Sequence, residues 1–251
     1  MGPPQTSEAI ILRSRAYGES DQIVTFLTET AGKLTGIAKG AKNSRRRFAN
    51  CLQPFTRVRV HYRTRPGTSL VFMDSCDLLQ APAGLVEPAK FAYGSYLVEL
   101  VDQFTEEADP VAPLFRLLAD ALDALQQGMA SGAFLRAFEL SLLHHSGYAP
   151  QLWACAQCTT PLAREARAFV DPSTGRAVCA RCRTGSDAGV VVAGDTLAAL
   201  EAVQGLPLAE ARVHRFGPSV GAEAAHLMGH LLAQHLPRPL RSVKLIAALA
   251  G

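Results

Sequence analysis

The sequence predicts an α+β protein in which a small N-terminal β-barrel is followed by an α-helical domain with an inserted four-cysteine module. Three observations lead to this prediction. Short apolar runs alternate with turn signals over the first 80 residues, apolar residues recur at helical spacing from about residue 88, and two Cys-x-x-Cys pairs interrupt the helical part. With 251 residues, of which 48% are hydrophobic, the chain is long enough to bury a core.

Five strands are expected in residues 1–80, and they lie near 8–13, 20–28, 33–38, 56–63 and 68–79. The fourth alternates between an apolar face and a polar face, and the polar face is formed by Arg57, Arg59, His61 and Arg63. Five antiparallel strands with a polycationic connection are typical of the OB-fold, a partly open oligonucleotide-binding barrel. An SH3-like barrel would give a similar pattern.

The remaining chain divides into three parts. Residues 81–150 are predicted to form a helical bundle, in which Ser131 caps a helix that runs from Ala133 to about His145. Residues 151–190 form the cysteine module. Residues 191–251 are expected to add helices near 195–204, 219–235 and 240–249 that pack on the helical domain.

The two cysteine pairs predict a tetrahedral Zn(II) site. Twenty residues separate the pairs, and the intervening segment reads as a strand and turn that would return the second pair to the first, as in a zinc ribbon. Four thiolates leave no open coordination position, so we expect a structural ion rather than a catalytic one. The alternative interpretation is a pair of redox dithiols or unrelated buried thiols. The predicted metal ligands are Cys155, Cys158, Cys179 and Cys182.

Positive charge is concentrated near the N-terminus, although the whole chain has a net charge of only +3. Between Glu29 and Asp74 there are ten Lys or Arg residues and no carboxylate. This pattern predicts a salt-sensitive nucleic-acid surface with little preference for base order. Neighbouring Phe48, Phe55, His61 and Tyr62 are expected to supply surfaces on which bases stack. The candidate contact residues are Lys33, Lys39, Lys42, Arg45, Arg46, Arg47, Arg57, Arg59 and Arg63.

Other functional classes are disfavoured by the sequence. It has no Walker-type Gly-Lys-Ser/Thr loop, no Gly-x-Ser-x-Gly elbow and no His-Glu-x-x-His helix, so we expect no catalytic residues. Signal-peptide order and long apolar stretches are also absent, which predicts a cytoplasmic protein with no membrane partner. A zinc-containing adaptor whose basic barrel binds an acidic protein is the alternative, because arginines that bind phosphate also bind carboxylates.

Several short strings resemble the bacterial recombination mediator family RecO. They follow one another in the family's order, and Phe169 and Gly175 precede the second cysteine pair in the family's manner. The strings are Tyr17-Gly18-Glu19-Ser20-Asp21, residues 36–41 (Gly-Ile-Ala-Lys-Gly-Ala), Leu52-Gln53-Pro54-Phe55 and Gly147-Tyr148-Ala149-Pro150.

This resemblance implies an N-terminal OB-fold, a central helical domain and an inserted zinc module. It also implies binding of single- and double-stranded DNA, annealing of complementary strands without ATP, and a location at the nucleoid. The implied partners are the RecR ring protein and the C-terminal tail of the single-stranded DNA-binding protein (SSB), with which the family helps to load recombinase.

Overall fold

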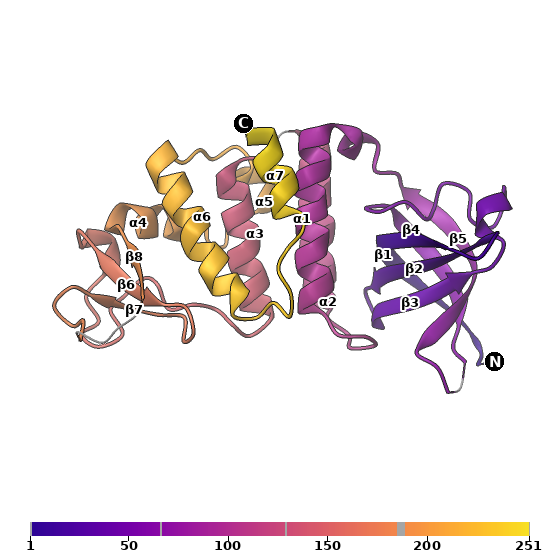
Figure 1. Cartoon of the computed structure of the whole chain (residues 1–251), viewed down its shortest axis with the longest axis horizontal. Helices are drawn as coiled ribbons and strands as arrows, with labels where there is room; N and C mark the ends of the chain where they lie inside the picture. The colour runs from indigo at the N-terminus through magenta and orange to yellow at the C-terminus, as the bar shows by residue number, and fades with distance from the viewer. Residues whose placement is uncertain (1, 66, 129, 185–188, 251) are drawn as a thin grey trace. The chain divides into compact units, whose positions relative to one another are not determined.

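The computed structural model describes residues 2–65, 67–128, 130–184 and 189–250 (Figure 1). They form two compact units, of which the first contains the described residues of 1–127 and 240–251 and the second contains the described residues of 128–239. The part of the predicted zinc module at 185–188 lies outside the described residues. Within these ranges, no helix has both the length and the apolar character needed to cross a bilayer.

The first unit begins with a closed five-stranded barrel, which confirms the OB-fold prediction. Its strands follow the order β1-β2-β3-β5-β4, and β1 closes the barrel by pairing with β4. The pairing of β3 with β5 is parallel, whereas the other pairings are antiparallel. The strands are β1 (Pro4–Tyr17), β2 (Asp21–Thr28), β3 (Gly32–Ala38), β4 (Arg57–Arg63) and β5 (Leu70–Gln80).

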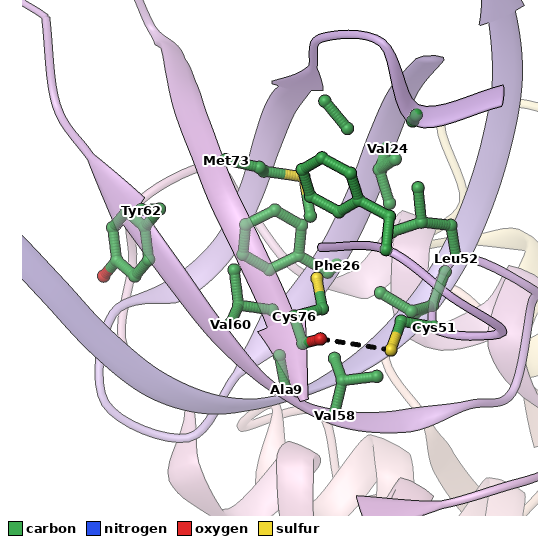
Figure 2. Close-up of a cluster of buried hydrophobic side chains, with 14 of the residues drawn as sticks. Ala9, Val24, Phe26, Cys51, Leu52, Val58, Val60, Tyr62, Met73 and Cys76 are labelled. Carbon is green, nitrogen blue, oxygen red and sulfur yellow. Dashed lines mark hydrogen bonds between the residues drawn. The ribbon is translucent and has the colours of Figure 1, made fainter. Parts of the chain in front are cut away.

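The barrel interior is filled by apolar residues from alternate strand positions (Figure 2). Phe26 packs edge-on against Tyr62 with ring centroids 6.3 Å apart. The thiols of Cys51 and Cys76 are also buried here, and Cys51 Sγ donates to the Cys76 carbonyl at 3.3 Å. Burial raises the pKa of both thiols, so these cysteines belong to the core and remain protonated at neutral pH.

Helices cover part of the outer barrel surface, which explains why Ala9–Leu12 are buried at consecutive positions instead of alternating. These helices are α1 (Pro88–Phe104) and α2 (Ala112–Gln127), and the connections contain short 3-10 turns at Ala41–Asn43 and Ala83–Val86. The final helix, α7 (Val243–Ala250), packs on α1. The Glu99 carboxylate holds the approach to α7 by accepting from the Arg241 and Ser242 backbone N–H groups at 2.9 and 2.8 Å.

The second unit joins a helical bundle to a small antiparallel sheet of order β7-β6-β8. Ser131 caps α3 as predicted, because its hydroxyl accepts from the Phe134 N–H at 3.2 Å. The sequence did not predict β8 or α5, since three and four residues are too few for a clear periodicity. The elements are α3 (Gly132–His145), a 3-10 turn (Leu162–Arg164), β6 (Ala168–Asp171), β7 (Arg176–Cys179), β8 (Val190–Val192), α4 (Gly194–Val203), α5 (Leu208–Ala211) and α6 (Pro218–Ala233).

Candidate nucleic-acid interface and metal centre

The segment that follows β3 carries five of the predicted contact residues between positions 39 and 47, and we call it the basic loop: Lys39, Lys42, Arg45, Arg46 and Arg47. Its backbone is tied to the turn between β1 and β2. The Asp21 carboxylate accepts from the Gly40 N–H at 2.8 Å, and the Lys42 N–H donates to the Ser20 carbonyl at 3.0 Å. Gly40 has a φ of +66°, a conformation that favours glycine. These hydrogen bonds therefore fix the backbone at the start of the loop.

The electrostatics at Asp21 agree with its hydrogen bond to the loop. The Gly40 N–H lowers the pKa of the Asp21 carboxyl below its ordinary value, while burial opposes that effect. The nearby charges of Lys39 and Lys42 lower it further. Asp21 is therefore ionised at neutral pH, and it holds the loop through the backbone rather than through a salt bridge to either lysine.

The charges of the basic loop are not neutralised by carboxylates within 4.0 Å in the part of the chain that the structure describes. The Lys42 ammonium donates to the carbonyls of Gly18 and Glu19 at 3.0 and 2.9 Å, and Arg47 donates to the Lys39 carbonyl at 2.8 Å. Carbonyls orient a cation without removing its charge. Arg45 and Arg46 are exposed, so the loop retains five positive charges that face solvent.

The basic face of β4 has a different environment from the one the sequence suggested. Its polar side chains point outward as predicted, but most of them meet carboxylates from other elements. Arg57 pairs with Asp123 at 3.3 Å, Arg63 with Asp74 at 2.9 Å and His61 with Asp77 at 2.9 Å. Arg59 remains exposed. Strand pairing with β5 and the packing of α2 bring in the acidic residues that the basic stretch itself lacks, so this face has little net charge with which to attract phosphate.

Lys33 occupies a structural position rather than an exposed one. Its ammonium lies 3.2 Å from the Asp102 carboxylate on α1 and also donates to the Asp102 backbone carbonyl. The two side chains are only 12% and 10% exposed, and Arg13 approaches the same carboxylate at 3.6 Å. Lys33 therefore joins the barrel to α1, and it does not share a surface with the basic loop.

Replacing Lys33 with Met is expected to lower the free energy of unfolding by about 3 kcal/mol, because the buried Asp102 carboxylate loses its main partner. Affinity for a single-stranded oligonucleotide should change less than about twofold. Urea unfolding and fluorescence anisotropy would measure the two quantities. Adding Asp102→Asn to this variant should restore part of the stability. A large loss of affinity at unchanged stability would instead return Lys33 to the binding surface.

The expected stacking surfaces are mostly buried, so this part of the prediction is wrong. Phe48, Phe55 and Tyr62 are 4%, 7% and 3% exposed and belong to the packed interior. An exposed aromatic does lie beside the basic loop, namely Tyr17 at the end of β1, which is 52% exposed. Tyr17 directly precedes Gly18 and Glu19, whose carbonyls accept from Lys42. The sequence analysis did not consider Tyr17 as a stacking surface.

The four predicted metal ligands come together in the second unit. Their sulfur atoms all lie within 4.8 Å of one another, and Cys158 Sγ is 3.7 Å from Cys179 Sγ. Four sulfurs placed about 2.3 Å from a tetrahedral ion are about 3.8 Å apart. The donor set and its spacing therefore fit Zn(II).

Backbone hydrogen bonds shape each cysteine pair into a tight turn. The Thr159 N–H donates to the Cys155 carbonyl at 2.9 Å, and the Cys182 N–H donates to the Cys179 carbonyl at 3.1 Å. A bond from the Ala156 N–H to the Ala177 carbonyl, also 2.9 Å, joins the first turn to β7. The β6–β7 hairpin thus returns the second pair to the first, as the zinc-ribbon interpretation predicts.

The thiols of the cluster differ in acidity. Burial disfavours the Cys155 thiolate, but hydrogen bonds from the backbone of both turns outweigh it and lower the pKa of Cys155 to about 6. Interactions with the Cys158 and Cys179 side chains raise the pKa of Cys182 to about 12. Cys155 is thus a thiolate at neutral pH, the form that binds a metal ion, whereas Cys182 must lose a proton when the ion binds.

Comparison with known proteins covers nearly the whole chain. A family model described as Recombination protein O N terminal matches residues 1–82, and one described as Recombination protein O C terminal matches residues 86–244. The DNA repair protein RecO of Anaeromyxobacter sp. (strain Fw109-5) is 39% identical over 236 residues, which are 92% of this chain and 91% of that one. The proteins of the same name from Myxococcus xanthus (strain DK1622) and Geobacter sulfurreducens are 37% and 35% identical, over 96% and 98% of both chains.

Proposed function

Because this chain belongs to the RecO family of DNA repair and recombination proteins, we propose that it binds single- and double-stranded DNA through the basic loop and anneals complementary strands without ATP. The observation that carries this proposal is the loop itself. Five cations stand together on a fixed turn of an OB-fold barrel and face solvent. Such a surface attracts phosphates irrespective of base order.

Annealing requires no bond to be made or broken by the protein. Two complementary strands repel each other through their phosphates, and a surface that neutralises part of this charge lets the bases approach and pair. The basic loop suits this task because its exposed cations project from a fixed backbone. The neutralised β4 face contributes less to the proposal, although its exposed Arg59 remains a candidate contact.

The proposal extends to partners and to the metal. As a recombination mediator, the protein would act at the nucleoid in the cytoplasm with RecR, and it would help to load recombinase onto DNA coated by SSB, whose C-terminal tail it would bind. When bound, Zn(II) would cross-link the two cysteine turns and so hold the hairpin in place. Cys155, Cys158, Cys179 and Cys182 would be its ligands, and no step on DNA would pass through the ion.

Salt dependence of binding tests the proposal. If about five phosphates are neutralised, affinity for a single strand should fall with about the 3.5th power of the salt concentration. Fluorescence anisotropy of a labelled oligonucleotide, titrated at several concentrations of KCl, gives this exponent. A dissociation constant that does not change between low and moderate salt would contradict phosphate contact.

A further inference from the structure

An open groove of about 680 Å³ lies on the barrel between the basic loop and the segment that enters β4. Its floor is apolar, because Ala41, Phe48 and Leu52 line it although each is at most 8% exposed. Lys42, Ser44 and Arg45 line it on the side of the basic loop, and residues of the segment 49–54 line the other side. A flat apolar group is the kind of ligand that would lie against such a floor.

The walls of the groove carry amide side chains with unused hydrogen-bonding groups. Gln22 Oε1 accepts from the Ser14 hydroxyl at 2.8 Å, which leaves the Gln22 amide N–H groups to donate elsewhere. In the described part of the chain, the side chains of Asn50 and Gln53 make no hydrogen bond, and both residues are exposed at the groove. Amides both donate and accept, which is what the polar edges of nucleobases require.

Two cations of the basic loop complete the groove. Lys42 and Arg45 both line it, so a ligand on the apolar floor would have positive charge beside it. Lys42 is held by the Gly18 and Glu19 carbonyls, whereas Arg45 extends into solvent. An apolar floor, free amides and adjacent cations match the three chemical parts of a nucleotide, which are a flat ring, its polar edge and a phosphate.

We propose that this groove holds one unpaired nucleotide of a bound single strand. Its base lies on the apolar floor beside Leu52 and Ala41, its edge meets the amides of Asn50 and Gln53, and its phosphate contacts Arg45. The proposal rests on the DNA binding proposed above and adds a base-dependent contact to a surface that otherwise recognises only phosphates. A base within a duplex is stacked and paired, so this contact is available only to single-stranded or locally opened DNA.

An oligonucleotide that lacks bases distinguishes the proposed base contact from phosphate binding. The zinc-loaded protein is titrated against a labelled single-stranded oligonucleotide and against one of equal length and charge in which abasic sites replace the nucleotides. We expect the base-bearing strand to bind about five- to tenfold more tightly, with the same salt exponent for both. Equal affinities would overturn the groove proposal and leave the proposed function intact, whereas salt-independent binding of both strands would contradict the proposed function.

Two substitutions test the residues. Asn50 has a φ of +57°, so Asn50→Gly removes its side chain without straining the backbone, and it is combined with Gln53→Ala. This variant should lose the preference for the base-bearing strand and bind the abasic strand normally. The matched control is Asn43→Ala, an exposed amide on the basic loop that does not line the groove. A preference retained in the double variant would remove these amides from the site.

A free nucleotide has the same chemistry as one unit of a strand, so its contribution is measured separately. Deoxyadenosine monophosphate is added at millimolar concentration to the complex with the base-bearing strand. We expect little displacement, because a single nucleotide cannot reach the other cations of the loop. Strong displacement that depends on Asn50 and Gln53 would identify the groove as a mononucleotide site and would overturn the assignment to DNA.

Discussion

Replacing Lys39, Arg45 and Arg46 with Glu is expected to weaken binding to a single strand at least about a hundredfold near 0.1 M salt, and to reduce the salt exponent by about 2. The three side chains form no salt bridge in the described structure and are not part of the barrel core. Thermal stability should therefore change little. Anisotropy titrations over a salt series measure both the affinity and the exponent.

The matched control carries the same change of charge on the β4 side of the barrel, in Arg59→Glu, Arg63→Glu and Arg65→Glu. There, Arg63 already pairs with Asp74, and Arg59 lies opposite Glu8 and Asp77 in the strand register. We expect a loss of less than about tenfold from this variant, caused mainly by long-range repulsion. Equal losses in the two triple variants would show that binding depends on overall charge rather than on the basic loop.

Replacing Cys155 and Cys179 with Ser is expected to reduce the zinc content from one ion per chain to none and to lower the thermal midpoint of the second unit by more than about 10 °C. Each substitution removes one ligand from a different cysteine turn, so neither turn can chelate the ion alone. Atomic emission would measure zinc, and near-ultraviolet circular dichroism would follow packing.

The control for this prediction is Cys76→Ala, which removes a thiol from the barrel core and should leave the zinc content at one ion per chain. Since the basic loop lies in the first unit, the cysteine variant should also retain its affinity for a single strand within about threefold. Loss of DNA binding in parallel with loss of zinc would assign the metal a role beyond folding. Full zinc retention after the double substitution would refute the four-cysteine site.

The sequence predicted the features that depend on local patterns. The apolar alternation of β4, the cap at Ser131 and the two cysteine pairs are each determined by residues a few positions apart, and the structure confirms them. The strand bounds also agree closely, although β1 is longer than expected because its ends pair with β2 and β4 beyond the apolar run.

The sequence could not show which charges neutralise one another. Asp74 and Asp123 follow the basic stretch in the chain, but strand pairing and helix packing place them beside Arg63 and Arg57. The burial of the aromatic residues is also a tertiary effect, because Phe48 lies in the connection between β3 and β4 and packs into the barrel core. Because of these contacts, three of the nine predicted contact residues, Lys33, Arg57 and Arg63, pair with carboxylates in the described structure.

The most direct test of a mediator that works through the basic loop is the annealing of two labelled complementary strands by the zinc-loaded protein, without ATP, over a salt series. We expect the protein to accelerate annealing, added salt to suppress this acceleration, and the Lys39→Glu, Arg45→Glu and Arg46→Glu variant to abolish it. The control variant on the β4 side should retain most of the rate. No acceleration by the intact protein at any salt concentration, or full acceleration by the loop variant, would contradict the proposed function.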